Sequence, residues 1–408
     1  MNPVERKCVL SVPNDLVQDI LSRLGVKDLL RLRCINKEWR TFIDDTNFIR
    51  KHYDAQHSIC KGKGNGNMPH FVYNGGDSET FCLVYVQQGE MITLNLNADL
   101  ERDSKDVVVD DRDRDRDRYD IISDGCVNGI ICLNWKHRDT ELNNFLSLWN
   151  PATREFKAIA YPNMPPLIQR SHFEVYGFGF DPLSNDFKIL GLYSITEFSC
   201  YYEMYSLQNN CWKRLREPKA DIGGIPMPTT DGYLNGVYYW TAEISGGHLV
   251  IVSLNFSTEV FEVSDPPQDA VSLHASQIYP SQTTITLYKE CLALAISHTV
   301  QEEALLYSID IWVVTRFDDC GVPLSWQHLF TVEPVHANSG LQLAASRLDG
   351  HLLISSLFPS EDCASDQDSE CWLYNPSTTK YTKLETDFCT WFRYLESLFP
   401  LSKRLDQV

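Results

Sequence analysis

The segment DGCVNGIICL at residues 124–133 decides the fold, because it occurs again in altered form as DGYLNGVYYW at residues 231–240. Each copy places Asn-Gly between two apolar runs, which is the strongest short-range signal for a β-hairpin. The glycines Gly129 and Gly236 are 107 residues apart, about twice a unit of fifty-odd residues. This repeat predicts a domain assembled from similar β-units.

Turn-forming residues continue the spacing along the chain. They lie near residues 76, 129, 185, 236, 290 and 350, in steps of 51 to 60 residues. A second marker, a strand that runs into Asn-Pro, is found in LSLWNPAT (146–153) and WLYNPSTT (372–379). Six such units fit a six-bladed β-propeller, in which each unit is a four-stranded blade. A two-sheet sandwich is the structural alternative, but it gives no reason for the repeat.

The first 53 residues carry a helical pattern instead. Leu16, Ile20 and Leu24 recur at every fourth position, which predicts an amphipathic helix that ends at Gly25. A second helix is expected from Asp28, and apolar residues between 42 and 49 suggest a third short turn. We therefore predict an α+β multidomain protein, with a small all-α unit of three short helices followed by a large all-β domain.

Composition sets the domain boundaries. The Gly-rich stretch KGKGNGN at residues 61–67 predicts a flexible linker. We expect a helical unit at 8–53, a linker at 54–70, the β-domain at 71–396 and a C-terminal tail at 397–408. A G-x-G-x-G pattern lies in this linker, but no strand precedes it and no Gly-Lys-Ser/Thr follows, so phosphate binding is a weak reading.

Charge is divided unequally between the two parts. The net charge is −19, but residues 1–53 hold 10 Lys and Arg against 7 Asp and Glu, or +3. The remainder holds 26 against 48, or −22. So acidic a body is repelled by nucleic acid and by anionic lipid and attracts basic proteins. No apolar run reaches the roughly 18 residues of a membrane span. We expect no nucleic-acid or membrane partner and a location in the cytoplasm, the nucleus or both.

Residues that could carry chemistry are few. The 13 cysteines contain no C-x-x-C pair, so neither a disulfide framework nor a cysteine-based zinc site is predicted. His52, His57 and Cys60 have a spacing that a metal accepts, but no fourth ligand lies nearby. The chain has none of the common hydrolase, metalloprotease or nucleotide-binding motifs. We predict no catalytic residue, no metal and no cofactor.

Two further features, a charged run and the strand tyrosines, have a structural interpretation and a functional alternative. The alternating run at residues 110–118 is expected to be a solvated loop, with a part in partner binding as the alternative. Most strand tyrosines are expected to pack inside blades, while those at loop ends could anchor a partner.

The N-terminal helices raise the question of what covers them. About fifty residues cannot close a core around so many large apolar side chains, and short helices are marginal alone. A separate partner is the favoured cover. Packing onto the chain's own β-domain is the alternative, against which the Gly-rich linker argues.

The segments SVPNDLVQDILSRL (11–24) and LLRLRCINKEWR (29–40) strongly resemble the F-box. The segments WNPAT (149–153), YGFGFD (176–181) and NGVYYW (235–240) look like the F-box-associated interaction domain of plant F-box proteins, most closely the S-locus F-box-like members. The two resemblances span nearly the whole chain.

The resemblance implies a non-catalytic substrate receptor of an SCF-type ubiquitin ligase. The F-box would dock on a Skp-type adaptor and through it on the cullin and RING subunits, and the β-domain would hold a target for ubiquitination and proteasomal degradation. The positions that match the adaptor-binding or supporting pattern are Val12, Pro13, Leu16, Ile20, Leu21, Leu24, Leu29, Leu32 and Trp39. Val12 stands where the family usually has Leu, and Gly25 where it usually has Pro, which would loosen the turn between the helices.

Two other functions stay open at this point. A pollen S-locus-type receptor for a basic self-incompatibility ribonuclease is compatible with the acidic body. A propeller enzyme or sugar-binding lectin with an incidental helical arm belongs to another class, but no motif supports it. The target, possibly basic, is not identified by any loop, and no substrate-binding residue is assigned.

Overall fold

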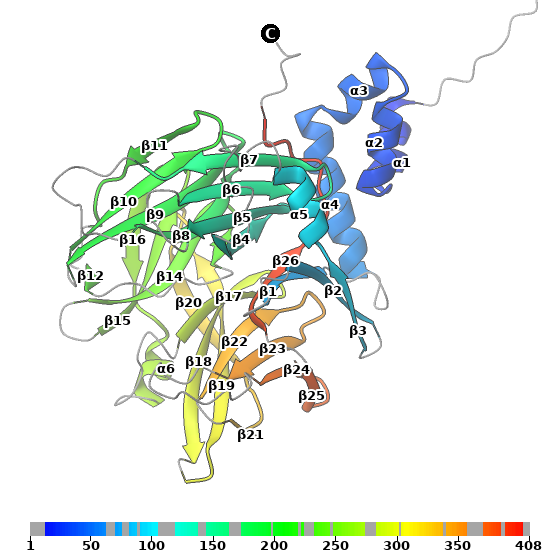
Figure 1. Ribbon diagram of the computed structural model, residues 1–408. Helices are drawn as coiled ribbons and strands as arrows, with labels where there is room; N and C mark the ends of the chain where they lie inside the picture. The colour runs from blue at the N-terminus through cyan, green and yellow to red at the C-terminus, as the bar shows by residue number, and fades with distance from the viewer. Residues whose placement is uncertain are drawn as a thin grey trace, which may run out of the picture.

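The computed structural model places four helices beside a ring of six β-sheets (Figure 1). The description covers residues 13–402 with the exception of 63–69, 76–80, 88–89, 105–118, 138–143, 163–172, 197–198, 219–221, 224–231, 245–247, 274–282, 302, 338–339, 357–369 and 385–387. Val12 and the charged run at 110–118 lie outside the described residues.

The N-terminal unit contains one helix more than the sequence pattern predicted. Its helices are α1 (Asn14–Ser22), α2 (Val26–Arg33), α3 (Lys37–Ile43) and α4 (Thr46–Gly62). Pro13 precedes α1, and the Asn36 side chain caps α3 by accepting a hydrogen bond from the Trp39 amide at 2.8 Å. The expected third short turn, from residues 42 to 49, spans the end of α3 and the start of α4, which is 17 residues long.

Buried polar contacts join α1 to α4. The fully buried His52 ring places Nε2 2.9 Å from the Leu24 carbonyl oxygen, so Nε2 carries the proton that is donated. The Gln56 amide donates to the carbonyls of Ser22 and Leu24, both at 3.0 Å. His52 Nδ1 is buried and has no hydrogen-bond partner among the described residues, and burial lowers the pKa of His52. The imidazole is therefore held in its neutral form.

Six antiparallel sheets form the propeller, as the repeat predicted. We number the blades along the chain, and each blade is given from its innermost to its outermost strand. Blade one is β26 (Phe388–Tyr394), β1 (His70–Gly75), β2 (Phe81–Gln87) and β3 (Glu90–Asn95). Blade two is β4 (Tyr119–Val127), β5 (Ile130–His137), β6 (Phe145–Asn150) and β7 (Glu155–Ala160). Blade three is β8 (Phe173–Asp181), β9 (Asp186–Thr196), β10 (Ser199–Ser206) and β11 (Cys211–Arg214).

The remaining blades repeat this order. Blade four is β12 (Ile222–Gly223) and β13 (Tyr233–Leu234), followed by β14 (Val237–Ile244), β15 (His248–Asn255) and β16 (Val260–Ser264). Blade five is β17 (Thr283–Tyr288), β18 (Cys291–Gln301), β19 (Leu306–Phe317) and β20 (Pro323–Thr331), with β21 (Val335–His336) beside β19. Blade six is β22 (Leu341–Ser346), β23 (Leu352–Ser356), β24 (Cys371–Asn375) and β25 (Lys380–Leu384). Helices α5 (Asn97–Ser104) and α6 (Gln268–Leu273) lie in connections between blades.

The predicted turns occupy one structural position in five blades. Asn128 and Gly129 have φ of 51° and 74°, and Asn235 and Gly236 have φ of 50° and 87°, as the mirror-image hairpin turn requires. Each pair joins the first strand of its blade to the second. The prediction for residues 74–76 is wrong in this respect, because Asn74 and Gly75 end β1, the second strand of blade one.

The C-terminal strand closes the ring. Strand β26 pairs with β1 from His70↔Tyr394 to Gly75↔Phe388 and so supplies the innermost strand of blade one. Closure of this kind leaves only the short outer edges of the blades unpaired. The sequence repeat could not show it, because the strand comes from the far end of the chain.

Two predicted boundaries differ from the structure. Residues 54–62, predicted as linker, belong to α4, and residues 63–69 lie outside the described part. The expected tail is not free over residues 397–401, where Leu398, Phe399 and Leu401 are buried. Leu398, Phe399 and Leu401 belong to a buried cluster that includes residues of blades two and three.

The structure also places the tyrosines, the cysteines and the helices that the sequence analysis considered. Tyr176, Tyr202, Tyr238 and Tyr239 are buried in the blades, as expected. Cys126 and Cys132 are free thiols. Over the described residues no helix is long and apolar enough to cross a membrane.

We predict that Gly129→Ala lowers the melting temperature by several degrees. The positive φ of 74° alone costs an alanine about 1–2 kcal/mol. An added Cβ would also overlap the Leu395 carbonyl and approach Ser397 Oγ to 2.9 Å. Gly25→Ala is the control, because a Cβ at Gly25 meets nothing within 4 Å. Thermal unfolding checks both variants, and an equal shift in the two would contradict the role given to Gly129.

We also predict that the protein loses stability as the pH falls from 7.5 to 5.5. A folded-state pKa of His52 below its unfolded value of about 6.5 means that the unfolded chain binds the proton first. The free energy of unfolding then falls by up to about 1.4 kcal/mol per pH unit below 6.5. His52→Gln should flatten this slope in urea titrations, whereas replacing the exposed His336 with Gln should not. Identical slopes in all three proteins would exclude His52 as the cause.

Candidate functional site

Helix α1 presents an apolar stripe to solvent. Leu16 and Ile20 are 56% and 58% exposed, and they lie one helical turn apart on the same face, with the exposed Pro13 one turn before Leu16. We call Pro13, Leu16 and Ile20 the α1 stripe. Ile35, which follows α2, is 63% exposed. Large apolar side chains left bare on a folded unit are typical of a surface that binds another protein.

The other predicted adaptor-binding residues support this surface from inside. Leu21 and Leu29 are buried, at 5% and 0% exposure, and Leu24, Leu32 and Trp39 are half-buried. All five pack in or against a buried cluster that runs from the helical unit into blades two and three. The predicted list therefore separates into exposed residues that can touch a partner and buried residues that hold them in place.

Ion pairs surround the helices without closing the stripe. Arg23 pairs with Asp19 at 3.1 Å and Arg31 with Asp28 at 3.0 Å, and all four side chains are exposed. Pairs of this kind add little stability. The Arg33 to Asp44 pair, at 2.8 Å, is less exposed and ties the end of α2 to the end of α3.

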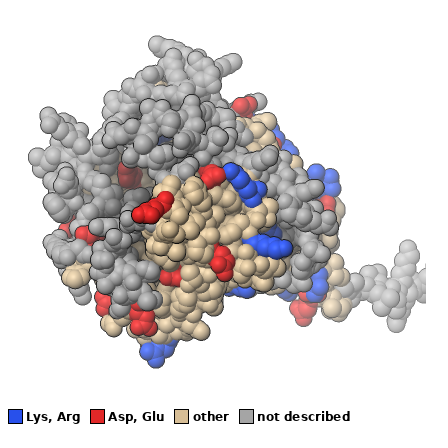
Figure 2. All heavy atoms as spheres, turned by 90° about the horizontal axis from the view of Figure 1, so that it is seen from below, with Lys and Arg blue, Asp and Glu red and all other residues tan. Residues whose placement is uncertain are grey.

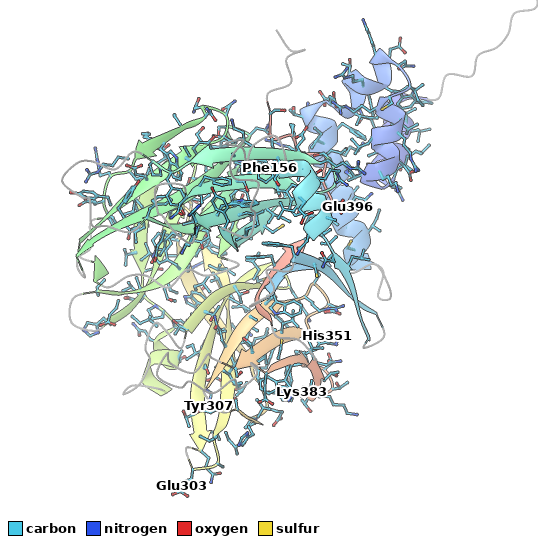
Figure 3. All side chains as sticks on the ribbon, in the orientation of Figure 1. Phe156, Glu303, Tyr307, His351, Lys383 and Glu396 are labelled. Carbon is cyan, nitrogen blue, oxygen red and sulfur yellow. The ribbon has the colours of Figure 1, made fainter. Side chains whose placement is uncertain are left out.

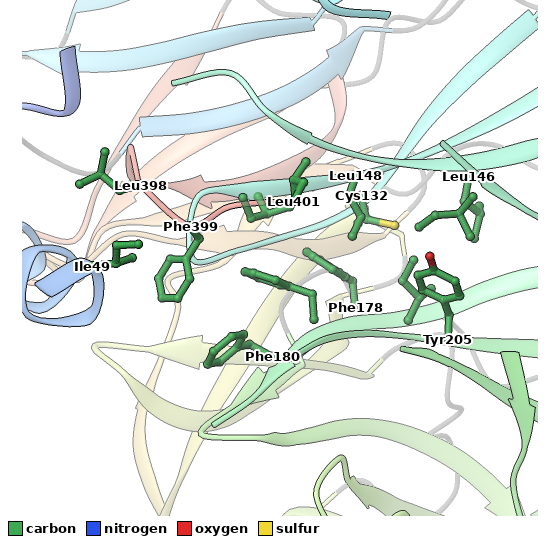
Figure 4. Packing of buried hydrophobic residues seen from close by; sticks show 14 of the residues in the cluster. Ile49, Cys132, Leu146, Leu148, Phe178, Phe180, Tyr205, Leu398, Phe399 and Leu401 are labelled. Carbon is green, nitrogen blue, oxygen red and sulfur yellow. The ribbon is translucent and has the colours of Figure 1, made fainter. Parts of the chain in front are cut away.

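Helix α4 fixes this unit to the propeller. Tyr53 contacts the ring of Phe399 edge-on, with 6.0 Å between centroids, and Ile49 belongs to the same buried cluster. Phe399 in turn packs on Phe180 of β8, with centroids 5.4 Å apart. Figure 4 shows Phe399 between Ile49 and Phe180. An apolar joint of this kind holds the helices in one orientation.

Polar contacts extend the joint along α4. The Arg50 guanidinium donates to Asn185 Oδ1 at 2.7 Å and to the Pro182 carbonyl at 3.1 Å, both in the turn between β8 and β9. His57 Nε2 lies 3.1 Å from Glu290 Oε1, in the turn between β17 and β18. Helix α4 thus spans from blade three to blade five. The alternative that the helices pack on the chain's own β-domain is correct for α4. It is wrong for the α1 stripe, which is exposed.

The sequence contains a helical pattern for α4 that the predicted helical unit, which ends at residue 53, does not include. Ile49, Tyr53, Gln56 and Cys60 follow one another at spacings of three and four, which continues a helical face beyond residue 53. Because a Gly-rich stretch follows, the predicted boundary between the helical unit and the linker was placed too early in the chain.

An Asn-Pro turn holds the C-terminal segment in this joint. Asn150 Nδ2 donates to the carbonyls of Ser397 and Phe399, at 3.2 and 3.0 Å, while Asn150 Oδ1 caps its own turn. Glu155 accepts a hydrogen bond from the Leu401 amide at 2.7 Å. In the matching turn of blade six, Asn375 Oδ1 accepts a hydrogen bond from the Ser377 amide at 2.9 Å, and within the described residues its side chain holds no other segment. In blade two, the repeated Asn-Pro motif therefore forms its turn and also binds the C-terminal segment.

A cavity of about 470 Å³ lies between α4 and the ring. Tyr53 and His57 line it from the helix, and Tyr233, Glu290 and Arg393 line it from the blades. The Arg393 guanidinium donates to the carbonyls of Ser346 and Leu287. Burial raises the pKa of Tyr53. The cavity thus belongs to the joint between the two parts of the chain.

The metal-like triplet is not brought together. His52 points to Leu24, His57 pairs with Glu290, and Cys60 is buried elsewhere along the helix. Positions 52 and 57 point to different sides of a helix because five residues turn it by about 500°. Within the described ranges, no group of three or more His, Cys, Asp and Glu side chains is placed to hold a metal ion.

The two faces of the propeller have different connections. The turns between first and second strands and those between third and fourth strands lie on one face, because neighbouring strands are antiparallel. This face carries α4 and the C-terminal segment. The strand ends that lead into the other connections lie on the opposite face, where Glu303 and Tyr307 stand at the far end of blade five (Figure 3). Seen from below, the described atoms include a broad uncharged area with acidic and basic side chains around it (Figure 2).

Comparison with known proteins identifies both parts of the chain. Residues 9–51 match the F-box domain, and residues 83–356 match the F-box associated beta propeller domain. Two Arabidopsis thaliana proteins illustrate the likeness. F-box protein CPR1 is 23% identical over 348 residues, which cover 79% of this chain and 73% of CPR1. F-box/kelch-repeat protein At3g23880 is 24% identical over 258 residues, which cover 62% of this chain and 64% of that protein.

Among solved structures, TolB from Acinetobacter baumannii is similar with a TM-score of 0.44 and 11% identity, over 85% of this chain and 72% of that chain. The family match covers residues 83–356, more than half of the 408 residues, and the F-box match covers the helical unit before it. The chain therefore belongs to the family of F-box proteins with an F-box-associated β-propeller.

Proposed function

We propose that the protein is the non-catalytic substrate receptor of an SCF-type ubiquitin ligase. The observation that carries the proposal is the bare α1 stripe, on a helical unit that α4 fixes to the propeller. One end of the molecule then binds a Skp-type adaptor, and the other holds a target. We place this activity in the cytoplasm, the nucleus or both.

We attribute adaptor binding to the exposed apolar residues. Each Leu or Ile that passes from water into a dry interface contributes about 1.5–3 kcal/mol. Leu16, Ile20 and Ile35 together supply a meaningful part of the free energy that association requires, and polar contacts at the rim supply more. Leu21 and Leu29 act indirectly, because they hold α1 and α2 in register beneath the contact surface.

The target side is proposed on the surfaces of the propeller that α4 leaves open. The turns of the α4 face are short and are in part occupied by the helix and the C-terminal segment. The opposite face has the longer connections, which is where binding specificity commonly resides. The charge of −22 beyond residue 53 favours a target with a basic surface.

The mechanism is positional. The receptor makes and breaks no bond; it raises the effective concentration of a target lysine near the ubiquitin-conjugating enzyme that the cullin brings. A stiff joint serves this mechanism because a loose one would spread the target over a larger volume. The contacts of Tyr53, Arg50 and His57 with the propeller supply that stiffness.

We predict that Leu16→Asp combined with Ile20→Asp abolishes co-purification with a Skp-type adaptor. Two carboxylates in place of exposed apolar side chains would have to be buried unpaired in the interface, at a cost that exceeds the binding they replace. Both side chains are more than half exposed, so the helical unit should still fold. Pull-down of the adaptor and circular dichroism check the two parts of the prediction.

The matched control is Leu183→Asp. Leu183 is 84% exposed and lies on the propeller, in the turn between β8 and β9. It should leave adaptor binding intact. Full adaptor binding by the double variant would remove the proposed function.

A further inference from the structure

A groove of about 510 Å³ separates blade two from blade three. Its first wall is the outermost strand of blade two, β7, with Lys157 and Ile159 among the lining residues. Its second wall comes from β10 and β11 and includes Glu203, Tyr205 and Trp212. The groove lies away from the α1 stripe and from the joint with α4.

The first wall is an unpaired sheet edge. The Trp212 indole N–H donates to the Ala160 carbonyl at 2.9 Å, so the backbone of residue 160 points away from β6 and into the groove. Pairing alternates along an antiparallel strand, and the backbone N–H and C=O of Ala158 therefore point the same way. Neither group has a recorded hydrogen-bond partner in the described chain. Such an edge is a template for one more strand.

The second wall carries a carboxylate without a partner. Glu203 lies on β10 between Tyr201 and Tyr205, whose rings pack toward blade two. It is half-buried, and no hydrogen bond or ion pair to it is found in the part of the chain that the structure describes. Burial raises the pKa of Glu203. The positive charge of Arg214 lowers this pKa, but by less than burial raises it.

Arg214 is directed elsewhere. It sits opposite Glu203 on β11, but its guanidinium lies over the Tyr201 ring at 3.6 Å and pairs with Glu217 at 3.2 Å. A half-buried carboxylate in this position gains most from a cation that enters the groove with another molecule.

We propose that this groove binds an extended segment of the target protein, which adds a strand to β7 and directs a Lys or Arg side chain to Glu203. This inference rests on the proposed function and names the chemistry of the target that the propeller holds. The backbone of Ala158 supplies affinity along the edge, and Glu203 selects the side chain.

Charge argues for a basic partner segment over a second copy of this chain. Two copies, each with a net charge of −19, repel one another, whereas a segment that carries a cation is attracted. Lys157 also lines the groove, so a run of several cations is disfavoured and a single one is expected.

The test uses fluorescence anisotropy with the full-length protein and labelled hexapeptides of alternating valine and threonine, with lysine, glutamine or glutamate at one central position. We expect the lysine peptide to bind about tenfold tighter than the glutamine peptide, as one charge-assisted hydrogen bond supplies. Methylation of alternate backbone amides should abolish binding. Equal affinity for the lysine and glutamate peptides, or no binding by any peptide at millimolar concentration, overturns the inference.

Variants locate the peptide on the protein. Glu203→Gln should remove the preference for lysine, and Ala158→Pro should weaken all peptides because it deletes the outward N–H without touching the ladder to β6. The matched control is Glu262→Gln, an exposed acid on β16 of blade four. Lysine preference that survives Glu203→Gln contradicts the assignment.

The same protein preparations are tested for adaptor binding. Peptide binding that persists while the adaptor fails to bind refutes the proposed ligase role and leaves the groove intact. Adaptor binding without any peptide binding refutes the groove alone.

Discussion

The packing of Phe399 between α4 and blade three is the contact on which the rest of the molecule depends. Ile49 and Tyr53 approach it from the helix, and Phe180 and Phe187 from the blade. Because Phe399 follows directly after the ring-closing strand β26, the same few residues end the propeller and seat the F-box. Neither part can shift without disturbing the other.

Ring closure and F-box docking are therefore coupled. With β26 paired to β1, residues 397–401 lie against Asn150 and Glu155. These two residues flank the Asn-Pro turn of blade two, whose neighbours lie in blades one and three. A propeller that has not closed would leave Ile49 and Tyr53 without their contacts. The helical unit is oriented both by this C-terminal segment and by the contacts of Arg50 and His57 with blades three and five.

The sequence predicted what is local and periodic. The series of turn residues near 76, 129, 185, 236, 290 and 350, together with the Asn-Pro turns, predicted six blades, because tight turns require residues that adopt particular backbone angles. The spacing of Leu16 and Ile20 likewise predicted the exposed side of α1. Contacts between distant segments were beyond such patterns. Nothing in the sequence around Phe399 indicates Phe180 as a neighbour. Glu203 and Lys157 line one groove only because two blades stand side by side.

The distribution of tasks over the propeller follows from its strand order. Tight turns at one face must adopt fixed angles and also carry α4, so their residues serve the joint: Asn185 binds Arg50, and Glu290 binds His57. Outer strands serve the joint less: in β7 only its first residue, Glu155, binds the C-terminal segment, and in the described chain the backbone edge at Ala158 stays open. A cation that reaches Glu203 along this edge would approach from the side of the ring, away from the α1 stripe. Adaptor and target could then be held at once, since neither surface lies within the contacts that join the two parts of the chain.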